Sequence, residues 1–225
     1  MGSTFYRAAR AAFCVPRLAC IREHVTGHAR ANREGPFILA CSHISHLEPV
    51  FVSSYVRRHI RWMSRIEFYR PPFGTLLDLT GAFPVDRFGN PSPAIRTAVR
   101  LLNQGEIIGM FPEGGVSLAK DSVLRGAPIK QGVCSIAIQT QAPVIPVVVL
   151  GTHTLNAIKP WLPTKSARVY IAFGEEVQPP QRSSGGPQQS RRTLRQEMAP
   201  RLIQAFTQTY RDLLQHANLS DTQFP

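Results

Sequence analysis

Short apolar runs alternate with amphipathic stretches along most of the chain. Short runs bounded by turn-forming residues are typical of buried strands, whereas apolar residues three or four apart favour helices. The pattern predicts strands at residues 37–41, 61–64, 82–85, 107–111, 144–150 and 169–173. It predicts helices at residues 47–57, 72–79, 93–103 and 132–139. Alternating strands and helices indicate an α/β layer architecture.

The N-terminal segment has a pattern of its own. Its apolar side chains can share one side of a helix: Phe5, Ala8, Ala9, Ala12, Phe13 and Leu18. Arginines occupy other positions, so this helix could lie in a membrane interface or pack on the core with a solvated basic side. Pro16 would kink either helix. We expect a basic amphipathic helical segment over residues 1–30.

The C-terminal part is predicted to be a linker followed by a helix. Residues 178–192 are rich in Pro, Gly, Gln and Ser, which predicts a flexible linker. An apolar repeat at helical spacing follows, made by Leu194, Met198, Leu202, Ala205 and Phe206. We expect a helix and tail over residues 193–225, with the helix docked on the domain or paired with a neighbour. Residues 31–177 would form the main domain.

Composition limits the class of protein. A chain of 225 residues with 43% hydrophobic content can bury one substantial core, and its length favours one domain. The formal net charge of +12 attracts membranes, nucleic acids or phosphorylated cofactors. The four cysteines lack CxxC spacing, which favours small buried hydrophobes in a reducing compartment. No window suits a spanning helix or a good signal peptide. We expect a cytoplasmic protein with peripheral association at the cytoplasmic membrane face.

The candidate chemistry begins with His43 and Glu48, just past the strand predicted at 37–41. A neutral imidazole can take a proton from an attacking alcohol if a partner fixes its tautomer and stabilises the imidazolium. On one straight helix, residues five apart point about 140° away from each other, so this pair needs a bend. Pro49 favours a helix that begins near Glu48 and leaves His43 on the preceding loop. The alternative is a His43 that only bonds a backbone group.

His46 opens a second interpretation, in which His43, His46 and Glu48 are metal ligands. The segment lacks the H-E-x-x-H arrangement, and no other His/Asp cluster has a persuasive spacing to complete a site. We therefore expect no metal. His46 would be an exposed loop residue or line the entrance for the acceptor.

Residues 42–49, Ser-His-Ile-Ser-His-Leu-Glu-Pro, resemble the H-x4-D block of the glycerolipid acyltransferase family, which includes lysophosphatidic acid acyltransferases. Residues 81–87 resemble the family's G-x-[IF]-x-[IV]-x-R block, and residues 111–117 resemble its F-P-E-G-T-R-S motif. Residues 143–147 resemble its V-P-[IV]-x-P-V block. The resemblance covers residues 35–175 or so. It implies a single domain with a central mixed, largely parallel sheet flanked by helices.

The resemblance implies an O-acyltransferase that needs no cofactor. It would move a fatty acyl group from acyl-CoA or acyl carrier protein to a hydroxyl of a lysophospholipid, foremost 1-acyl-glycerol-3-phosphate. His43 would be the general base, and Glu48 would hold its imidazole during direct transfer. Backbone amides near Glu113, Gly114 and Gly115 are candidates to stabilise the oxyanion, because glycine lets the main chain approach closely. Glu113 would organise the acceptor site.

Two departures from the family pattern affect these expectations. Glu48 stands where the family usually has Asp, so its carboxylate is one methylene further from the backbone. Val116 stands where the family has an arginine assigned to the acceptor phosphate, and valine carries no charge. Arg87, Arg125 and Lys130 could replace that arginine, or each could be a solvated surface charge.

A basic stretch follows the predicted catalytic helix and interleaves arginine with aromatic residues: Arg57, Arg58, Arg61, Trp62, Arg65, Phe68, Tyr69 and Arg70. It could meet coenzyme A, acyl carrier protein or anionic headgroups, or be a solvated face. Such a stretch can also bind single-stranded nucleic acid, but no RNP, KH or helix-turn-helix signature accompanies it. Two other functions stay open: acylation of a glycolipid or aminolipid, and a catalytically silent lipid-binding module with the same fold.

Overall fold

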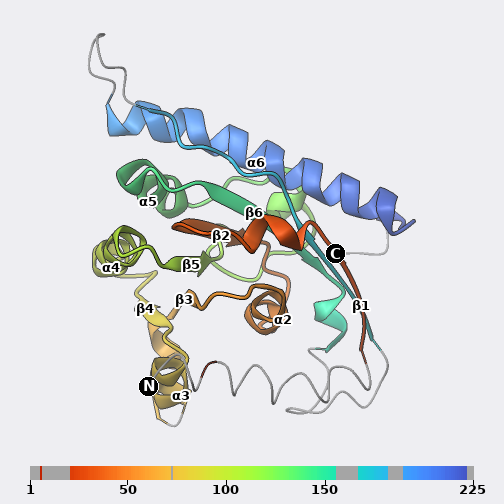
Figure 1. Cartoon of the computed structure of the whole chain (residues 1–225), viewed down its shortest axis with the longest axis horizontal. Helices are drawn as coiled ribbons and strands as arrows, with labels where there is room; N and C mark the ends of the chain where they lie inside the picture. Colours follow the sequence, from red (N-terminus) through yellow and green to blue (C-terminus); the bar gives the residue numbers. More distant parts are fainter. Residues whose placement is uncertain (1–5, 7–20, 72, 156–166, 182–189, 222–225) are drawn as a thin grey trace.

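The structure is a computed structural model that describes residue 6 and residues 21–71, 73–155, 167–181 and 190–221. These residues contain a seven-stranded sheet with the order β1-β7-β6-β2-β5-β3-β4 (Figure 1). The strands are β1 (Ile21–Thr26), β2 (Phe37–Cys41), β3 (Ile60–Arg65), β4 (Phe83–Val85), β5 (Ile107–Met110), β6 (Val144–Leu150) and β7 (Ala167–Phe173). All neighbouring strands are parallel except β6 and β7. The predicted mixed, largely parallel sheet is confirmed.

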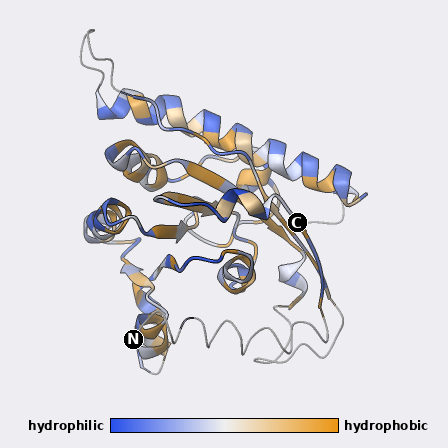
Figure 2. Ribbon diagram, in the orientation of Figure 1, coloured by the Kyte–Doolittle hydropathy of each residue, from blue (hydrophilic) through white to orange (hydrophobic). Residues whose placement is uncertain are grey.

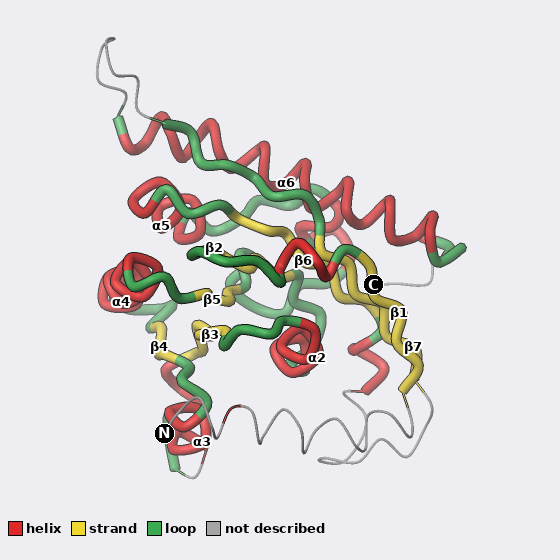
Figure 3. The backbone as a smooth tube through the Cα atoms, viewed as in Figure 1, coloured by secondary structure: helices red, strands yellow, loops and turns green. Residues whose placement is uncertain are grey.

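Helices cover both faces of this sheet, as the tube in Figure 3 shows. On one face lies α2 (Glu48–Tyr55), and on the other lie α4 (Ser92–Asn103), α5 (Gly132–Thr140) and α6 (Arg191–His216). The short α3 (Phe73–Leu79) lies beside β4 (Figure 1). The 3-10 helices are η1 (His28–Ala31), η2 (Ile66–Phe68), η3 (Ala119–Asp121), η4 (Val123–Arg125) and η5 (Thr152–Leu155).

Alternation along β2 divides the core into two clusters. Ile38 and Ala40 pack with the residues of α4, α5 and α6, whereas Phe37, Leu39 and Cys41 pack in the cluster that contains α2. Successive side chains of a strand point to opposite faces, so a strand covered on both sides is apolar throughout. Figure 2 accordingly shows hydrophobic strands beneath helices with hydrophilic outer faces. This is why the bounds of β2 and β6 match the prediction.

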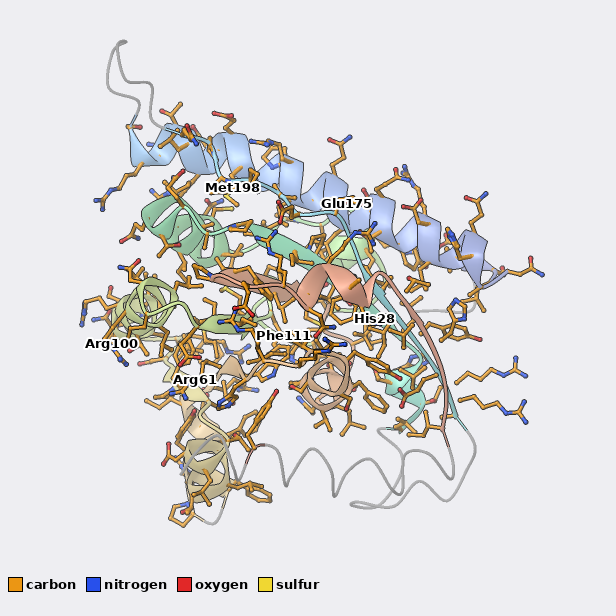
Figure 4. The ribbon with its side chains drawn as sticks, in the orientation of Figure 1. His28, Arg61, Arg100, Phe111, Glu175 and Met198 are labelled. Carbon is orange, nitrogen blue, oxygen red and sulfur yellow. The ribbon has the colours of Figure 1, made fainter. Side chains whose placement is uncertain are left out.

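The C-terminal helix docks on the domain, as one of the two predicted alternatives had it. Leu194, Met198, Leu202 and Phe206 of α6 are fully buried in the cluster shared with α5. Figure 4 shows Met198 on the side of α6 that faces α5. Because burying one such side chain contributes about 1.5–3 kcal/mol, this apolar face holds the helix in place.

Residues 21–26 correct the prediction for the N-terminal segment. They form strand β1, paired in parallel with β7, and are not part of a helix that extends to residue 30. Arg22, Glu23 and His24 break the apolar pattern that marked the other strands, since β1 is an edge strand whose residues stay partly exposed. The amphipathic residues 7–20 and most of the predicted linker lie outside the described residues. The other predicted elements agree with the structure within two residues at each end.

Candidate functional site

His43 and Glu48 form a hydrogen-bonded pair beyond the C-terminal end of β2. Nδ1 of His43 lies 3.0 Å from Oε2 of Glu48. His43 is on the loop after β2, and Glu48 begins α2 with Pro49 in its first turn, so the predicted bend is present. The side chain of Glu48 is fully buried, and that of His43 is 13% exposed. An ionised carboxylate only accepts hydrogen bonds, so beside it a neutral imidazole would carry its proton on Nδ1 and leave Nε2 as the acceptor.

Thr152 holds the other oxygen of the Glu48 carboxylate. Its Oγ1 donates a hydrogen bond to Oε1 of Glu48 at 2.7 Å, and both side chains are buried. Thr152 begins η5, directly after the C-terminal end of β6. Sequence reasoning missed it, and the only signal was this position at the edge where α/β sheets bind ligands. With one partner on each oxygen, the longer carboxylate of Glu48 has a fixed orientation toward the imidazole.

Glu113 ties the loop of His43 to the loop that precedes η4. Its Oε2 accepts a hydrogen bond from the backbone N–H of His43 at 2.7 Å. Its Oε1 accepts from the hydroxyl of Ser122 and the backbone N–H of Val123, each at 2.9 Å. Burial raises the pKa of Glu113, and these hydrogen bonds oppose the shift. Because both oxygens are engaged, the carboxylate holds the two loops together and is poorly placed to act as a second base.

Two further rings stack behind the imidazole. The ring of His43 lies 4.0 Å from that of Phe111, which lies 5.4 Å from Trp62, and both pairs are nearly parallel. The indole of Trp62 donates to the hydroxyl of Ser53 on α2 at 3.0 Å. It also packs against Gly109, where a Cβ would come within 2.5 Å of the indole. Figure 4 shows Phe111 in the middle of the molecule, near α2. The stack limits the orientations open to the imidazole.

Arg87 and Arg65 bring positive charge to the same region. Nη1 of Arg87 lies 3.3 Å from the point that a Cβ on Gly115 would occupy. Burial lowers the pKa of Arg87, and the charge of Arg65 lowers it further. The pKa of His46 is lowered by burial first and then by His43, with a smaller contribution from Arg65. The ring of His46 lies 5.8 Å from that of His43 and 6.1 Å from that of Phe68. The guanidinium of Arg65 lies over the same Phe68 ring, so Arg65 is near the two histidines.

Lys130 and Arg125 have different surroundings. The side chain of Lys130 passes over Gly114, where an added Cβ would lie 3.1 Å from Cγ of Lys130. Lys130 therefore borders the loop of residues 111–117. The guanidinium of Arg125 pairs with Asp221 and lies over the ring of Tyr210 at 5.4 Å. It lines a cavity of about 650 Å³ against α6. The structure therefore brings Lys130 to the edge of the site and gives Arg125 partners from the C-terminal part of the chain.

Other titratable groups add little to this site. Among the described residues, no group of His, Cys, Asp and Glu could hold a metal ion. Cys41 and Cys134 are buried free thiols, as predicted, and burial raises the pKa of Cys134 to about 11.

In the described part of the chain, no helix is both long and apolar enough to cross a membrane.

The fold and the oriented histidine define a class of enzyme. Residues 22–150 match the family described as Acyltransferase, and the chain belongs to that family. It is 33% identical to the 1-acyl-sn-glycerol-3-phosphate acyltransferase of Bacillus subtilis over 173 residues, which cover 73% of this chain and 81% of that protein. The protein of that name from Cocos nucifera is 30% identical over 52% of this chain and 38% of its own length. The predicted family is confirmed.

A solved structure shows the same fold. The crystal structure of the 1-acyl-sn-glycerophosphate (LPA) acyltransferase PlsC from Thermotoga maritima matches with a TM-score of 0.65 and 19% identity. The match covers 95% of this chain and 79% of that chain. Together with the family match and the named relatives, this establishes an acyltransferase of the 1-acylglycerol-3-phosphate acyltransferase type.

Proposed function

We propose that this acyltransferase moves a fatty acyl group from acyl-CoA or acyl carrier protein to the free hydroxyl of 1-acyl-glycerol-3-phosphate. The observation that carries the proposal is the pair of His43 and Glu48, because Glu48 takes Nδ1 and leaves Nε2 for an acceptor hydroxyl. The names of the relatives supply the substrate class. We place the enzyme at the cytoplasmic face of the membrane, where such an acceptor resides.

In the proposed mechanism, His43 is the general base. Its Nε2 takes the proton of the acceptor hydroxyl as the hydroxyl oxygen attacks the thioester carbonyl, and Glu48 stabilises the imidazolium. When the tetrahedral intermediate collapses, the carbon–sulfur bond breaks and the imidazolium returns the proton to the leaving thiolate. Transfer is direct, without an acyl-enzyme. The amide of Gly114 already donates to the carbonyl of Phe111 at 3.1 Å, so we assign the oxyanion to the amide of Gly115.

We propose that Arg87 and Arg65 bind the acceptor phosphate in place of the arginine that Val116 replaces. Arg87 reaches the glycine next to Val116, and the charge of Arg65 is one of the causes that lower the pKa of Arg87. A phosphate between two guanidinium groups would relieve their repulsion and accept charge-assisted hydrogen bonds from both. Lys130 would border the same acceptor site.

A second candidate is an acceptor without a phosphate, such as a glycolipid or an aminolipid. The observation that favours it is the side chain of Val116, which is apolar and exposed next to the glycine pair. In this case the arginines would contact anionic headgroups of neighbouring lipids instead of the acceptor.

Replacement of Arg87 separates the two candidates. Arg87→Ala removes charge-assisted hydrogen bonds worth about 1.5–3 kcal/mol, so the KM for lysophosphatidic acid should rise about 10- to 100-fold. The KM for an uncharged monoacylglycerol acceptor should stay as it is. Arg125→Ala is the matched control, because Arg125 is engaged by Asp221. Equal KM values for lysophosphatidic acid in the two variants would contradict the phosphate site.

A further inference from the structure

Exposed large apolar side chains are concentrated in one part of the fold. Within the described residues they are Ile66, Phe68, Phe73, Leu76, Leu79, Phe88, Val116 and Leu118. All lie between the end of β3 and η3, and none of those described lies on β6, β7, α5 or α6. Single exposed apolar residues are normal, whereas a cluster of them marks an interaction surface.

Five of these side chains form what we name the η2–α3 surface: Ile66, Phe68, Phe73, Leu76 and Leu79. Phe73, Leu76 and Leu79 recur every three residues, so they share one side of the short helix. The opposite side carries Gly74, which approaches Tyr69 so closely that a Cβ would lie 2.6 Å from its backbone oxygen. The Gly74 side of the helix therefore packs against the backbone of Tyr69, and the opposite side exposes an apolar stripe. Figure 1 shows α3 at the end of the molecule away from α6.

The η2–α3 surface reaches the candidate active site. The ring of Phe68 lies 6.1 Å from that of His46, which lies 5.8 Å from His43. The guanidinium of Arg65 lies over the ring of Phe68 at 5.4 Å. Arg70 is exposed between η2 and α3. Arg65 pairs with Glu67, and Asp78 of α3 is exposed as well, so the preference for an anionic bilayer comes from Arg70 and from the formal net charge of +12 of the whole chain. On such a bilayer the apolar groups enter the acyl region while the guanidinium group contacts headgroups.

We propose that the η2–α3 surface docks on an anionic lipid bilayer and so sets the entrance near His46 against the membrane. The inference rests on the proposed function, since a membrane lipid is the acceptor in that function. Docking on this side would let an acceptor reach His43 by lateral movement, without leaving the lipid phase. It would also orient the sheet with its β3–β4 end toward the bilayer and α6 away from it.

Residues 7–20 of the chain are the competing occupant of this surface. Tyr6 lies 4.0 Å from the ring of His59, ring centre to ring centre. Nε2 of His59 lies 2.7 Å from the carbonyl oxygen of Thr80, directly after α3. Tyr6 therefore lies near the C-terminal end of α3, and the test has to distinguish the chain that follows Tyr6 from lipid.

Phe73→Trp provides that test in vesicles of phosphatidylcholine and phosphatidylglycerol with brominated acyl chains. Docking predicts that the added tryptophan emits as an exposed indole in buffer, shifts to the blue with vesicles, and loses most of its fluorescence to bromine. Gln208→Trp on the exposed side of α6 is the matched control and should show neither change. Emission of a buried indole in buffer, unchanged by brominated vesicles, would assign the surface to residues 7–20. An exposed indole without quenching would equally overturn the proposal.

The double variant Phe73→Ser, Leu76→Ser measures how much the η2–α3 surface contributes to binding of vesicles. Its partition onto the same vesicles without bromine should fall at least about tenfold, since two exposed apolar side chains lose their burial in lipid. Turnover of acyl-CoA with a short-chain, monomeric lysophosphatidic acid should stay within about twofold, because surface substitutions rarely disturb a fold. Undiminished partition in an active double variant refutes the docking surface alone. An inactive parent that still docks refutes the proposed function alone.

Discussion

Glu48→Gln tests the proposed mechanism, because it replaces one carboxylate oxygen by an NH₂ group. The amide keeps the shape of the carboxylate but loses its charge and one of its two acceptor oxygens. When His43 becomes an imidazolium, opposite charges about 4 Å apart interact by about 4 kcal/mol at an effective dielectric constant near 20. The hydrogen bond of 3.0 Å between Nδ1 and Oε2 places the pair in this range. Because each 1.36 kcal/mol or so is a factor of ten, kcat should fall about a thousandfold.

The geometry around Glu48 adds to this loss. The carboxylate receives two donors, Nδ1 of His43 on one oxygen and the hydroxyl of Thr152 on the other. An amide has only one acceptor oxygen, so one of these two donors would face the NH₂ group. That donor must then break its hydrogen bond, or His43 must change its tautomer. If His43 becomes the tautomer with its proton on Nε2, it no longer accepts a proton there.

The assay is the initial rate of thiol release from palmitoyl-CoA with lysophosphatidic acid, at saturating concentrations of both. Glu34→Gln, at an exposed position before β2, is the matched control and should keep the parent rate. Circular dichroism and thermal unfolding establish that each variant is folded. A folded Glu48→Gln protein that retains more than about a tenth of the parent kcat would refute the assigned role of the carboxylate.

Two further predictions use the same assay. Glu48→Asp restores the residue usual in the family but withdraws the carboxylate by about 1.5 Å, so kcat should fall about 10- to 100-fold unless the backbone shifts; parent activity would show that the site adapts to either carboxylate. Thr152→Val should lower kcat about tenfold with little change in KM, because Glu48 loses a donor of about 1 kcal/mol or more, whereas Thr152→Ser should restore the rate. Equal losses in the two Thr152 variants would point to a packing role only.

The parts of the fold that were predictable are those whose burial shows in the local pattern of apolar residues. Strands β2 and β6 are covered on both faces, so their apolar runs have the same bounds as the strands. Strand β1 carries polar residues and pairs with β7, more than 140 positions away, and its sequence alone does not distinguish a strand from the end of an amphipathic helix.

The same limit applies to the site. His43 and Glu48 are five positions apart, and Pro49 signals where the helix begins, so their pairing was predictable. The bond between Glu48 and Thr152 spans 104 positions. The pair of Arg125 and Asp221 spans 96 positions, and no local signal told Arg125 apart from Arg87 as a phosphate ligand. Contacts of this kind depend on how the sheet is assembled.

The most direct measurement is the analysis by mass spectrometry of the lipid products formed from palmitoyl-CoA and lysophosphatidic acid, with His43→Ala beside the parent. The proposed function predicts a palmitoylated phosphatidic acid in step with thiol release, and neither in folded His43→Ala. Equal product from a folded His43→Ala protein would contradict the role of His43 as the base. Vesicle binding without any product, from either thioester donor and any lysolipid, would favour the catalytically silent lipid-binding module.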